Sequence, residues 1–275
     1  MDFRTNTVII TGATSGIGAA FARHFAREGA RLILCGRRED VLARRVAEAS
    51  TLGAGSVETV VGDLADESVV GRILQVIASE DVAGLVNNAG FGLHAPFEHA
   101  DPEQLRAMLR VQAEVPMRLA RAVAPGMQRR RSGLIVNVGS LAGRVAVPGS
   151  ALYVSTKVYL ERLSETLALE LGAHGIVVQA LTPGYVKTDF HRDIENYEAK
   201  RRNRGLIRWM DAEDVVSYSA RAFLRAERRL QGRRAAPRRR EVVVIPGLAN
   251  RFLAALAPFI PRSIIYRAAT SQKPM

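Results

Sequence analysis

Short apolar runs alternate with longer amphipathic segments along most of this chain. The runs are rich in Val, Ile and Leu and show little polar alternation, which is typical of parallel strands covered on both faces. The segments between them have the length and periodicity of helices. We therefore predict an α/β fold in which one doubly wound sheet of about seven parallel strands carries helices on both faces. The expected strands are 7–10, 31–35, 57–61, 82–87, 134–138, 176–181 and 242–245, and the expected helices are 17–28, 39–51, 66–78, 102–129, 151–172 and 212–229.

The domain organisation follows from this pattern, which contains neither an internal repeat nor a linker. We predict one domain over residues 1–246, with a variable lid at about 189–210, and an apolar and basic tail over 247–275. Cys35 is the only cysteine, so an intramolecular disulfide is impossible and a reducing, cytoplasmic setting is favoured. We expect neither a secretory signal nor a spanning helix, because every apolar run is too short for either.

Positive charge is concentrated in one stretch. The formal net charge is +12, and residues 221–240 hold nine arginines and one acid, Glu227. Such a stretch suits nucleic acid, acidic lipid or a phosphorylated substrate, and it is equally typical of a solvated loop. It contains no nucleic-acid reader motif and no interleaved aromatic side chains, so we do not expect nucleic-acid binding.

Residues 11–18, TGATSGIG, connect the first expected strand to the first expected helix. Gly12, Gly16 and Gly18 are placed where a tight turn, a close approach to phosphate and close helix packing each need a residue without a side chain. The start of the helix then offers free N–H groups to an anion. A plain turn is the alternative, but the position between strand and helix favours a Rossmann-type phosphate loop.

The end of the second strand indicates which dinucleotide this loop binds. Sites for NAD usually place an acid there to bind the ribose 2′-hydroxyl, whereas sites for NADP place an arginine nearby. This chain has Cys35-Gly36-Arg37-Arg38, with no acid. Because guanidinium groups form charge-assisted, bidentate bonds with phosphate, we predict NADP(H), with Arg37 as the main contact and Arg38 as a helper.

With these features, the sequence resembles the short-chain dehydrogenase/reductase family. The resemblance extends over about residues 5–190 and rests on several motifs in the family's order. They are TGATSGIG at 11–18, Asp63-Leu64, NNAG at 87–90, Ser140 in NVGS, Tyr153 and Lys157 in YVSTK, and PGYVKT at 183–188.

The resemblance implies three catalytic roles. Tyr153 is the general acid in ketone reduction and the general base in alcohol oxidation, and Ser140 binds the substrate oxygen. Lys157, one helical turn after Tyr153, holds the nicotinamide ribose. A phenol has a pKa of about 10, and we expect positive charge near Tyr153 to lower it.

The resemblance also implies which residues contact the cofactor and the substrate. The cofactor contacts are Thr11, Gly12, Ser15, Gly16, Ile17, Gly18, Arg37, Arg38, Asp63, Leu64, Asn88, Ala89, Gly90, Tyr153, Lys157, Pro183, Gly184, Val186 and Thr188. The substrate contacts are Ser140, Leu141, His94 and Phe190, and the many apolar side chains nearby favour a hydrophobic ketone, aldehyde or alcohol. We predict no metal site, because His94 and His191 have no partners at ligand spacing.

The sequence departs from the family pattern at Gln112, where members usually have an asparagine that holds a water near the active-site lysine. We predict Gln112 as a fourth catalytic residue, because its amide has the same groups one methylene further out. A cofactor-binding scaffold with weak catalysis is the alternative function, and Gln112 is the one feature that favours it.

Two expectations concern partners. Family members usually form homodimers or homotetramers through the long helices, here 102–129 and 151–172. In the tail, Phe252, Leu253, Leu256, Phe259 and Ile260 form one apolar stripe, which Ile264, Ile265 and Tyr266 continue. The stripe either packs on the fold or on a second subunit, or it makes peripheral contact with the inner face of a membrane.

Overall fold

The computed structural model describes residues 2–4, 6–191, 203, 208–231, 236–259, 261, 263 and 266–267. In this part of the chain seven strands form one sheet in the order β3-β2-β1-β4-β5-β6-β7, and all pairs are parallel. The predicted fold class is therefore confirmed. The strands are β1 (Thr7–Thr11), β2 (Arg31–Gly36), β3 (Ser56–Val61), β4 (Val82–Asn87), β5 (Gly133–Val138), β6 (Ile176–Leu181) and β7 (Val243–Val244).

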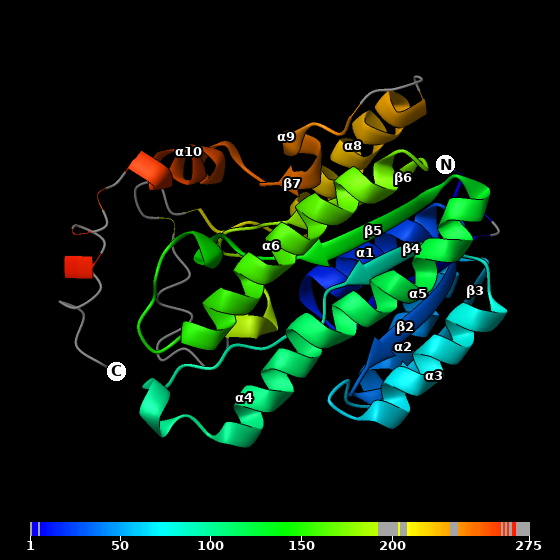
Figure 1. Cartoon of the computed structure of the whole chain (residues 1–275). Helices are drawn as coiled ribbons and strands as arrows, with labels where there is room; N and C mark the ends of the chain where they lie inside the picture. The colour runs from blue at the N-terminus through cyan, green and yellow to red at the C-terminus, as the bar shows by residue number, and fades with distance from the viewer. Residues whose placement is uncertain are drawn as a thin grey trace.

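Helices cover both faces of the sheet (Figure 1). The helices of the described part of the chain are α1 (Gly16–Arg27), α2 (Glu39–Thr51), α3 (Glu67–Ser79), α4 (Pro102–Leu109), α5 (Val115–Arg130), α6 (Ala151–Gly172), α8 (Ala212–Gln231), α9 (Arg239–Val242) and α10 (Leu248–Leu256). Successive strand residues point to opposite faces. Val8 and Ile10 therefore pack with α1, α2 and α8, while Ile9 packs with α3, α5 and α6.

The predicted long helix 102–129 is wrong in one respect. A π-helical turn, η2 (Arg110–Glu114), separates α4 from α5. Pro116 gives a physical reason, because it has no N–H to donate to the carbonyl of Gln112 four residues earlier. Turns of this kind are rare and occur frequently at functional sites.

The last strand is shorter than the predicted 242–245. Val242 belongs to the short helix α9, where the carboxylate of Glu241 accepts hydrogen bonds from the backbone N–H of Arg238 and from Nε of Arg229. This buried carboxylate holds the chain in a helical turn up to Val242, so β7 begins only at Val243.

Part of the arginine-rich stretch is used within the fold. Arg229 pairs with buried Glu241, and Nε of Arg239 lies 3.1 Å from Oε1 of Glu165 on α6. Arg221 stacks over the ring of Tyr218, with 4.8 Å between the guanidinium carbon and the ring centre. These contacts favour a structural role for much of this stretch.

Candidate active site

The glycine-rich loop is shaped for a ligand that approaches the backbone closely. Gly12 and Gly16 have φ of +67° and +57°, the left-handed region that favours glycine. A Cβ on Gly12 would lie 2.8 Å from Nδ2 of Asn88, and one on Gly18 would lie 2.3 Å from the carbonyl oxygen of Gly12. The first turn of α1 has no acidic side chain, and Ser15 makes no side-chain cap. The first N–H groups of α1 therefore suit a phosphate, and the loop fits a dinucleotide.

Thr11 and Asn88 join the loop after β1 to the loop after β4. The hydroxyl of Thr11 accepts hydrogen bonds from the N–H groups of Asn88 and Ala89, at 3.0 and 3.1 Å. Nδ2 of Asn88 donates to the carbonyl oxygens of Thr11 and Gly12, at 3.1 and 3.0 Å. Thus Thr11 and Asn88, both predicted as cofactor contacts, also fix the backbone of the phosphate loop.

A buried amide chain lies deeper, behind these loops. Nδ2 of Asn87 donates to Oδ1 of Asn137 at 2.8 Å, and Nδ2 of Asn137 donates to the hydroxyl of Ser164 at 2.9 Å. The chain links β4, β5 and α6, which positions α6 relative to the sheet. Asn137 and Ser164 were missed by sequence reasoning, although an asparagine inside an apolar strand was a usable signal.

The predicted catalytic side chains meet at the end of β5 and the start of α6. Ser140 follows β5, and its hydroxyl, which accepts a hydrogen bond from the N–H of Ala142 at 3.1 Å, lies close enough to Tyr153 to lower the pKa of that phenol. Tyr153 and Lys157 share one face of α6, with Nζ of Lys157 5.4 Å from the centre of the tyrosine ring. Nζ of this buried lysine donates to the carbonyl oxygen of Val138 at 3.1 Å. The structure thus brings Ser140, Tyr153 and Lys157 together.

Burial is the main electrostatic influence on these groups. It raises the pKa of Tyr153, and the hydrogen bond with Ser140 opposes this by lowering it. We expected nearby positive charge to lower this pKa, so the expectation is wrong for the protein without a ligand. Burial also lowers the pKa of Lys157 from its ordinary value of 10.5 to about 8. Lys157 is therefore still mostly protonated at neutral pH, but it loses its proton more readily than an exposed lysine.

The loop after β6 contacts both the phosphate loop and the catalytic residues. The N–H of Leu141 donates to the carbonyl oxygen of Pro183 at 2.9 Å. A Cβ on Gly16 would lie 2.7 Å from Cγ2 of Thr188, so Thr188 borders the start of α1. Val186 is buried and forms a bridge with Met210. The predicted stretch from Pro183 to Thr188 therefore spans the two parts of the site.

The two predicted specificity arginines point to different partners. Nη1 of Arg37 lies 3.4 Å from Oδ2 of Asp63, whereas Nη2 of Arg38 donates to the hydroxyl of Thr14 at 3.1 Å. Arg38 also lines a cavity of about 440 Å³ beside the phosphate loop, which further basic side chains border. The basic side chains around this cavity are Arg23, Arg38, Arg44, Arg45 and Lys187. Leu64, which follows Asp63, is buried.

Gln112 lies in the π-helical turn and is fully buried. Its Nε2 donates to the carbonyl oxygen of Phe91 at 2.9 Å, while its Oε1 has no hydrogen-bond partner among the described residues. A Cβ on Gly90 would lie 2.9 Å from this Oε1, so Gly90 leaves the space that the longer amide needs. The amide of Gln112 thus holds the loop after β4, a positioning role.

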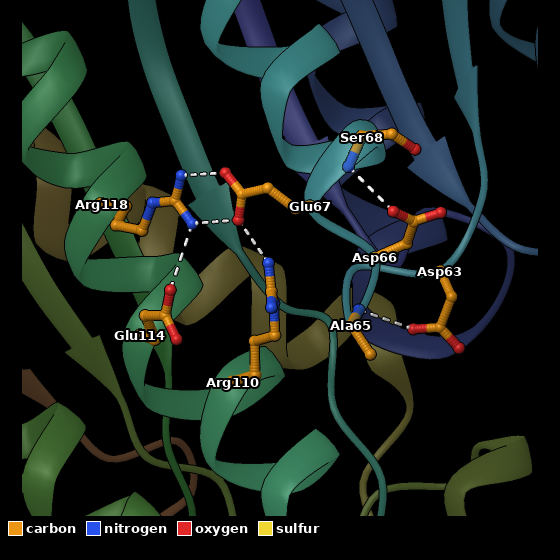
Figure 2. Close-up of polar contacts among 8 residues, drawn as sticks. All are labelled: Asp63, Ala65, Asp66, Glu67, Ser68, Arg110, Glu114 and Arg118. Carbon is orange, nitrogen blue, oxygen red and sulfur yellow. Dashed lines mark hydrogen bonds and ion pairs between the residues drawn. The ribbon is translucent and has the colours of Figure 1, made fainter.

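An ion-pair cluster clamps both ends of the π-helical turn (Figure 2). Glu67, the first residue of α3, accepts two hydrogen bonds from Arg118 at 2.5 and 2.7 Å and a third from Arg110. Arg118 also donates to Glu114 at 3.1 Å. The hydrogen bonds from Arg118 are the largest cause of the lowered pKa of Glu67. Arg110 and Glu114 begin and end the turn, so the cluster ties it to α3.

The predicted substrate residues lie around Tyr153. The ring of Phe190 packs against the ring of Tyr153 with 5.7 Å between centres, and Nδ1 of His94 is hydrogen-bonded with the hydroxyl of Ser150 at 2.8 Å. Leu141 follows Ser140 in a short 3-10 helix, η3 (Leu141–Arg144). Of the predicted lid, 192–202 and 204–207 lie outside the described residues.

A small cavity of about 20 Å³ borders Tyr153, and sequence reasoning found only part of its lining. Phe97, Leu105 and Leu152 line this cavity and were missed. Phe97 and Leu105 come from the segment between β4 and the π-helical turn, which carries no recognisable motif.

No group of three or more His, Cys, Asp and Glu side chains in the described part of the chain is placed to hold a metal ion. None of the described helices is long and apolar enough to cross a membrane.

A doubly wound sheet whose first helix starts at a glycine cradle defines a dinucleotide-binding protein. The short chain dehydrogenase family matches residues 6–199, and the chain belongs to this family of oxidoreductases. Family members bind NAD or NADP, act on small substrates and generally form oligomers.

Relatives agree with this assignment. Dehydrogenase/reductase SDR family member 7B from Bos taurus is 34% identical over 195 residues, 68% of this chain and 59% of that protein. This chain thus matches less than two thirds of that relative. Sulfoacetaldehyde reductase 2 from Chromohalobacter salexigens is 36% identical over 225 residues, 78% of this chain and 88% of that protein. A short-chain dehydrogenase from Sphingobium yanoikuyae, solved in complex with NADPH, is 29% identical with a TM-score of 0.75, and 95% of each chain is covered.

Proposed function

We propose that this protein interconverts a hydrophobic ketone or aldehyde and its alcohol with NADP(H), using Tyr153 as general acid and base. The observation that carries the proposal is the arrangement on α6 and β5. The hydroxyl of Ser140 lies close enough to Tyr153 to lower its pKa, and Lys157 lies one turn away with its ammonium 5.4 Å from the tyrosine ring. A scaffold without turnover gives no reason to bury a lysine at this point.

The chemistry assigns one task to each side chain. The nicotinamide, when bound, supplies the hydride in reduction and accepts it in oxidation. In reduction the hydroxyl of Tyr153 gives its proton to the substrate oxygen, and in oxidation the phenolate takes the proton back. Ser140 donates a hydrogen bond to the same substrate oxygen as charge develops there. Lys157 holds the ribose, and together with the oxidised nicotinamide, when that is bound, its positive charge favours the phenolate against the effect of burial.

Arg37 and Arg38 support a preference for NADP(H). Both guanidinium groups lie near the tip of β2, where the adenosine ribose of a dinucleotide binds in this fold. Each has a carboxylate nearby, Asp63 at 3.4 Å from Arg37 and Asp189 at 3.8 Å from Arg38. A 2′-phosphate adds a stronger partner for these groups, whereas a 2′-hydroxyl does not. We propose that both arginines contact the phosphate.

The test is a fluorescence titration with NADPH and with NADH, followed by NADPH consumption in the presence of a series of long-chain and aromatic ketones. Ser140→Ala is expected to bind NADPH normally and to lose most turnover. Ser155→Ala, a hydroxyl on the exposed side of α6, is the matched control and keeps its turnover. NADPH binding without consumption of any ketone or aldehyde would favour the scaffold instead.

A further inference from the structure

The outward face of α10 is apolar. Asn250 and Ala254 are buried on its inner side, while Leu248 and Phe252 are 78% and 53% exposed. At about 100° per residue, Leu248 and Phe252 lie nearly opposite Asn250 on the helix. A surface helix of a globular protein normally turns its apolar side inward, so α10 has apolar side chains where polar ones are expected. Leu256 and Phe259 continue the exposed set, and we call Leu248, Phe252, Leu256 and Phe259 the α10 face.

The C-terminal segment that contains this face carries charge of one sign. Residues 242–275 contain three arginines and one lysine and no Asp or Glu. At the base of α10, the guanidinium groups of Arg221 and Arg251 lie over the ring of Tyr218, 4.8 and 5.3 Å from its centre. A second copy of the same positive segment would repel this surface, whereas anionic lipid headgroups attract it. Charge therefore favours a lipid surface over a second copy.

The α10 face is also fixed beside the candidate active site. Nδ2 of Asn250 donates to the carbonyl oxygen of Pro246 at 2.8 Å, which anchors the start of the helix. A Cβ on Gly184 would lie 2.7 Å from Oδ1 of Asn250, so α10 contacts the loop that continues to Thr188. It also packs against η3, which follows Ser140. Figure 1 shows α10 outside the two helix layers, beyond β7.

We propose that the α10 face docks on an anionic lipid surface. Apolar side chains at the end of a basic segment enter the boundary between headgroups and acyl chains, while arginines bind the headgroups. Because α10 borders the loops after β5 and β6, docking places these loops beside the bilayer. The substrate is then a lipid-soluble carbonyl or alcohol that enters from the membrane. The docking stands by itself, and only this substrate class rests on the proposed function.

The experiment is co-sedimentation of the full chain with two kinds of vesicle, phosphatidylcholine alone and phosphatidylcholine with phosphatidylserine in equal parts. We expect binding to the anionic vesicles that weakens with added salt. Phe252→Glu is expected to weaken it by about tenfold or more, because a large apolar side chain is lost and a negative charge is added. Leu224→Glu, at an exposed leucine on α8, is the matched control and keeps the binding.

Ala255→Glu is a second α10 variant for the case that Phe252→Glu fails to fold. It is expected to fold normally, because Ala255 is exposed and glutamate is a good helix former. It is expected to weaken vesicle binding with an unchanged circular dichroism spectrum. Vesicle binding that is absent in the intact chain, or unchanged in both α10 variants, overturns the proposal. Sedimentation velocity gives a third outcome: if Phe252→Glu dissociates an oligomer and vesicles do not bind, the face joins two copies and the proposal is wrong. No cofactor or substrate is used, so failure here leaves the oxidoreductase proposal untouched.

Discussion

The catalytic side and the adenosine side of the candidate site are built in different ways. Lys157 is buried, and Tyr153 is enclosed against Ser140 and Phe190. On the adenosine side, Arg37 and Asp63 are 71% and 48% exposed and form a loose pair. Groups that are buried away from water have shifted pKa values and interact strongly with nearby charges, whereas exposed charges interact weakly with each other. On the catalytic side the fold itself sets the pKa values of the reacting groups. On the adenosine side, only exposed charges are available to contact a cofactor.

The largest effect is expected at the enclosed phenol. Tyr153→Phe removes the proton donor without changing the ring, so turnover falls by about a thousandfold while NADPH binding changes little. Steady-state kinetics and a fluorescence titration measure the two quantities. Tyr159→Phe, six residues later on the same helix, is the control and keeps normal turnover. Equal turnover in the two variants contradicts the role of Tyr153.

The buried lysine gives the next largest effect, and it appears in the stability of the fold. Between pH 8 and 10.5 the unfolded chain binds more protons at Lys157 than the folded one, because the folded pKa is lowered to about 8. Stability from this group therefore rises with pH across that window. Below pH 8 the folded state carries the full cost of a buried charge, on the order of 3 kcal/mol.

Lys157→Met is consequently expected to raise the free energy of unfolding most below pH 8, with the gain shrinking as the pH approaches 10.5. Urea unfolding across this pH range, without cofactor, measures it. A gain that is independent of pH, or that grows with pH, shows that the ammonium is not held in the buried state that the structure describes.

Exposed charges predict a smaller effect on the adenosine side. Arg37→Ala and Arg38→Ala are each expected to weaken NADPH binding by about tenfold and NADH binding little, since each removes one charge-assisted contact with the 2′-phosphate. Arg106→Ala, an exposed arginine on α4, is the control. If only one arginine changes the preference, the two side chains have separate duties, as their different partners suggest. If neither substitution changes the preference, the preference is set elsewhere in the protein.

The smallest effect is expected at the ion-pair cluster, which links the two kinds of environment. Glu67→Gln loosens the clamp on the π-helical turn and thereby the amide of Gln112. Because the cluster is exposed, turnover is expected to fall by less than about tenfold, and more at low salt than at high salt. Glu103→Gln, in a similar exposed pair on α4, is the control. A change in KM alone, with kcat unaltered, contradicts a positioning role.

Features of the fold and the candidate site were predictable from the sequence where they depend on neighbouring segments of the chain. The parallel sheet follows from apolar runs that need cover on both faces, and Ser140, Tyr153 and Lys157 meet because β5 and α6 are consecutive elements. The different partners of Arg37 and Arg38 depend on the distant Asp63 and Thr14, which no spacing reveals. The exposure of the α10 face could not be predicted for another reason. An apolar stripe in a sequence does not say whether that side of the helix is buried.

Tail residues Ile260, Ile264 and Ile265, which the sequence pattern added to the stripe, lie outside the described residues. The π-helical turn could not be predicted from the sequence either. Pro116 was visible in the sequence, but proline near a helix start and proline inside a helix give the same letter pattern.

The π-helical turn has a consequence for the rotational phase of the helix that it interrupts. It accommodates one residue more than an α-helical path between the same ends, so α4 is rotated by about 100° relative to α5. Met108 is fully buried but lies outside the apolar cluster that contains Val115 and Leu119. A one-residue deletion within 110–114 would therefore turn the side of α4 that carries Met108 away from its present contacts. The extra residue in the π-helical turn therefore lets α4 and α5 pack against different surroundings.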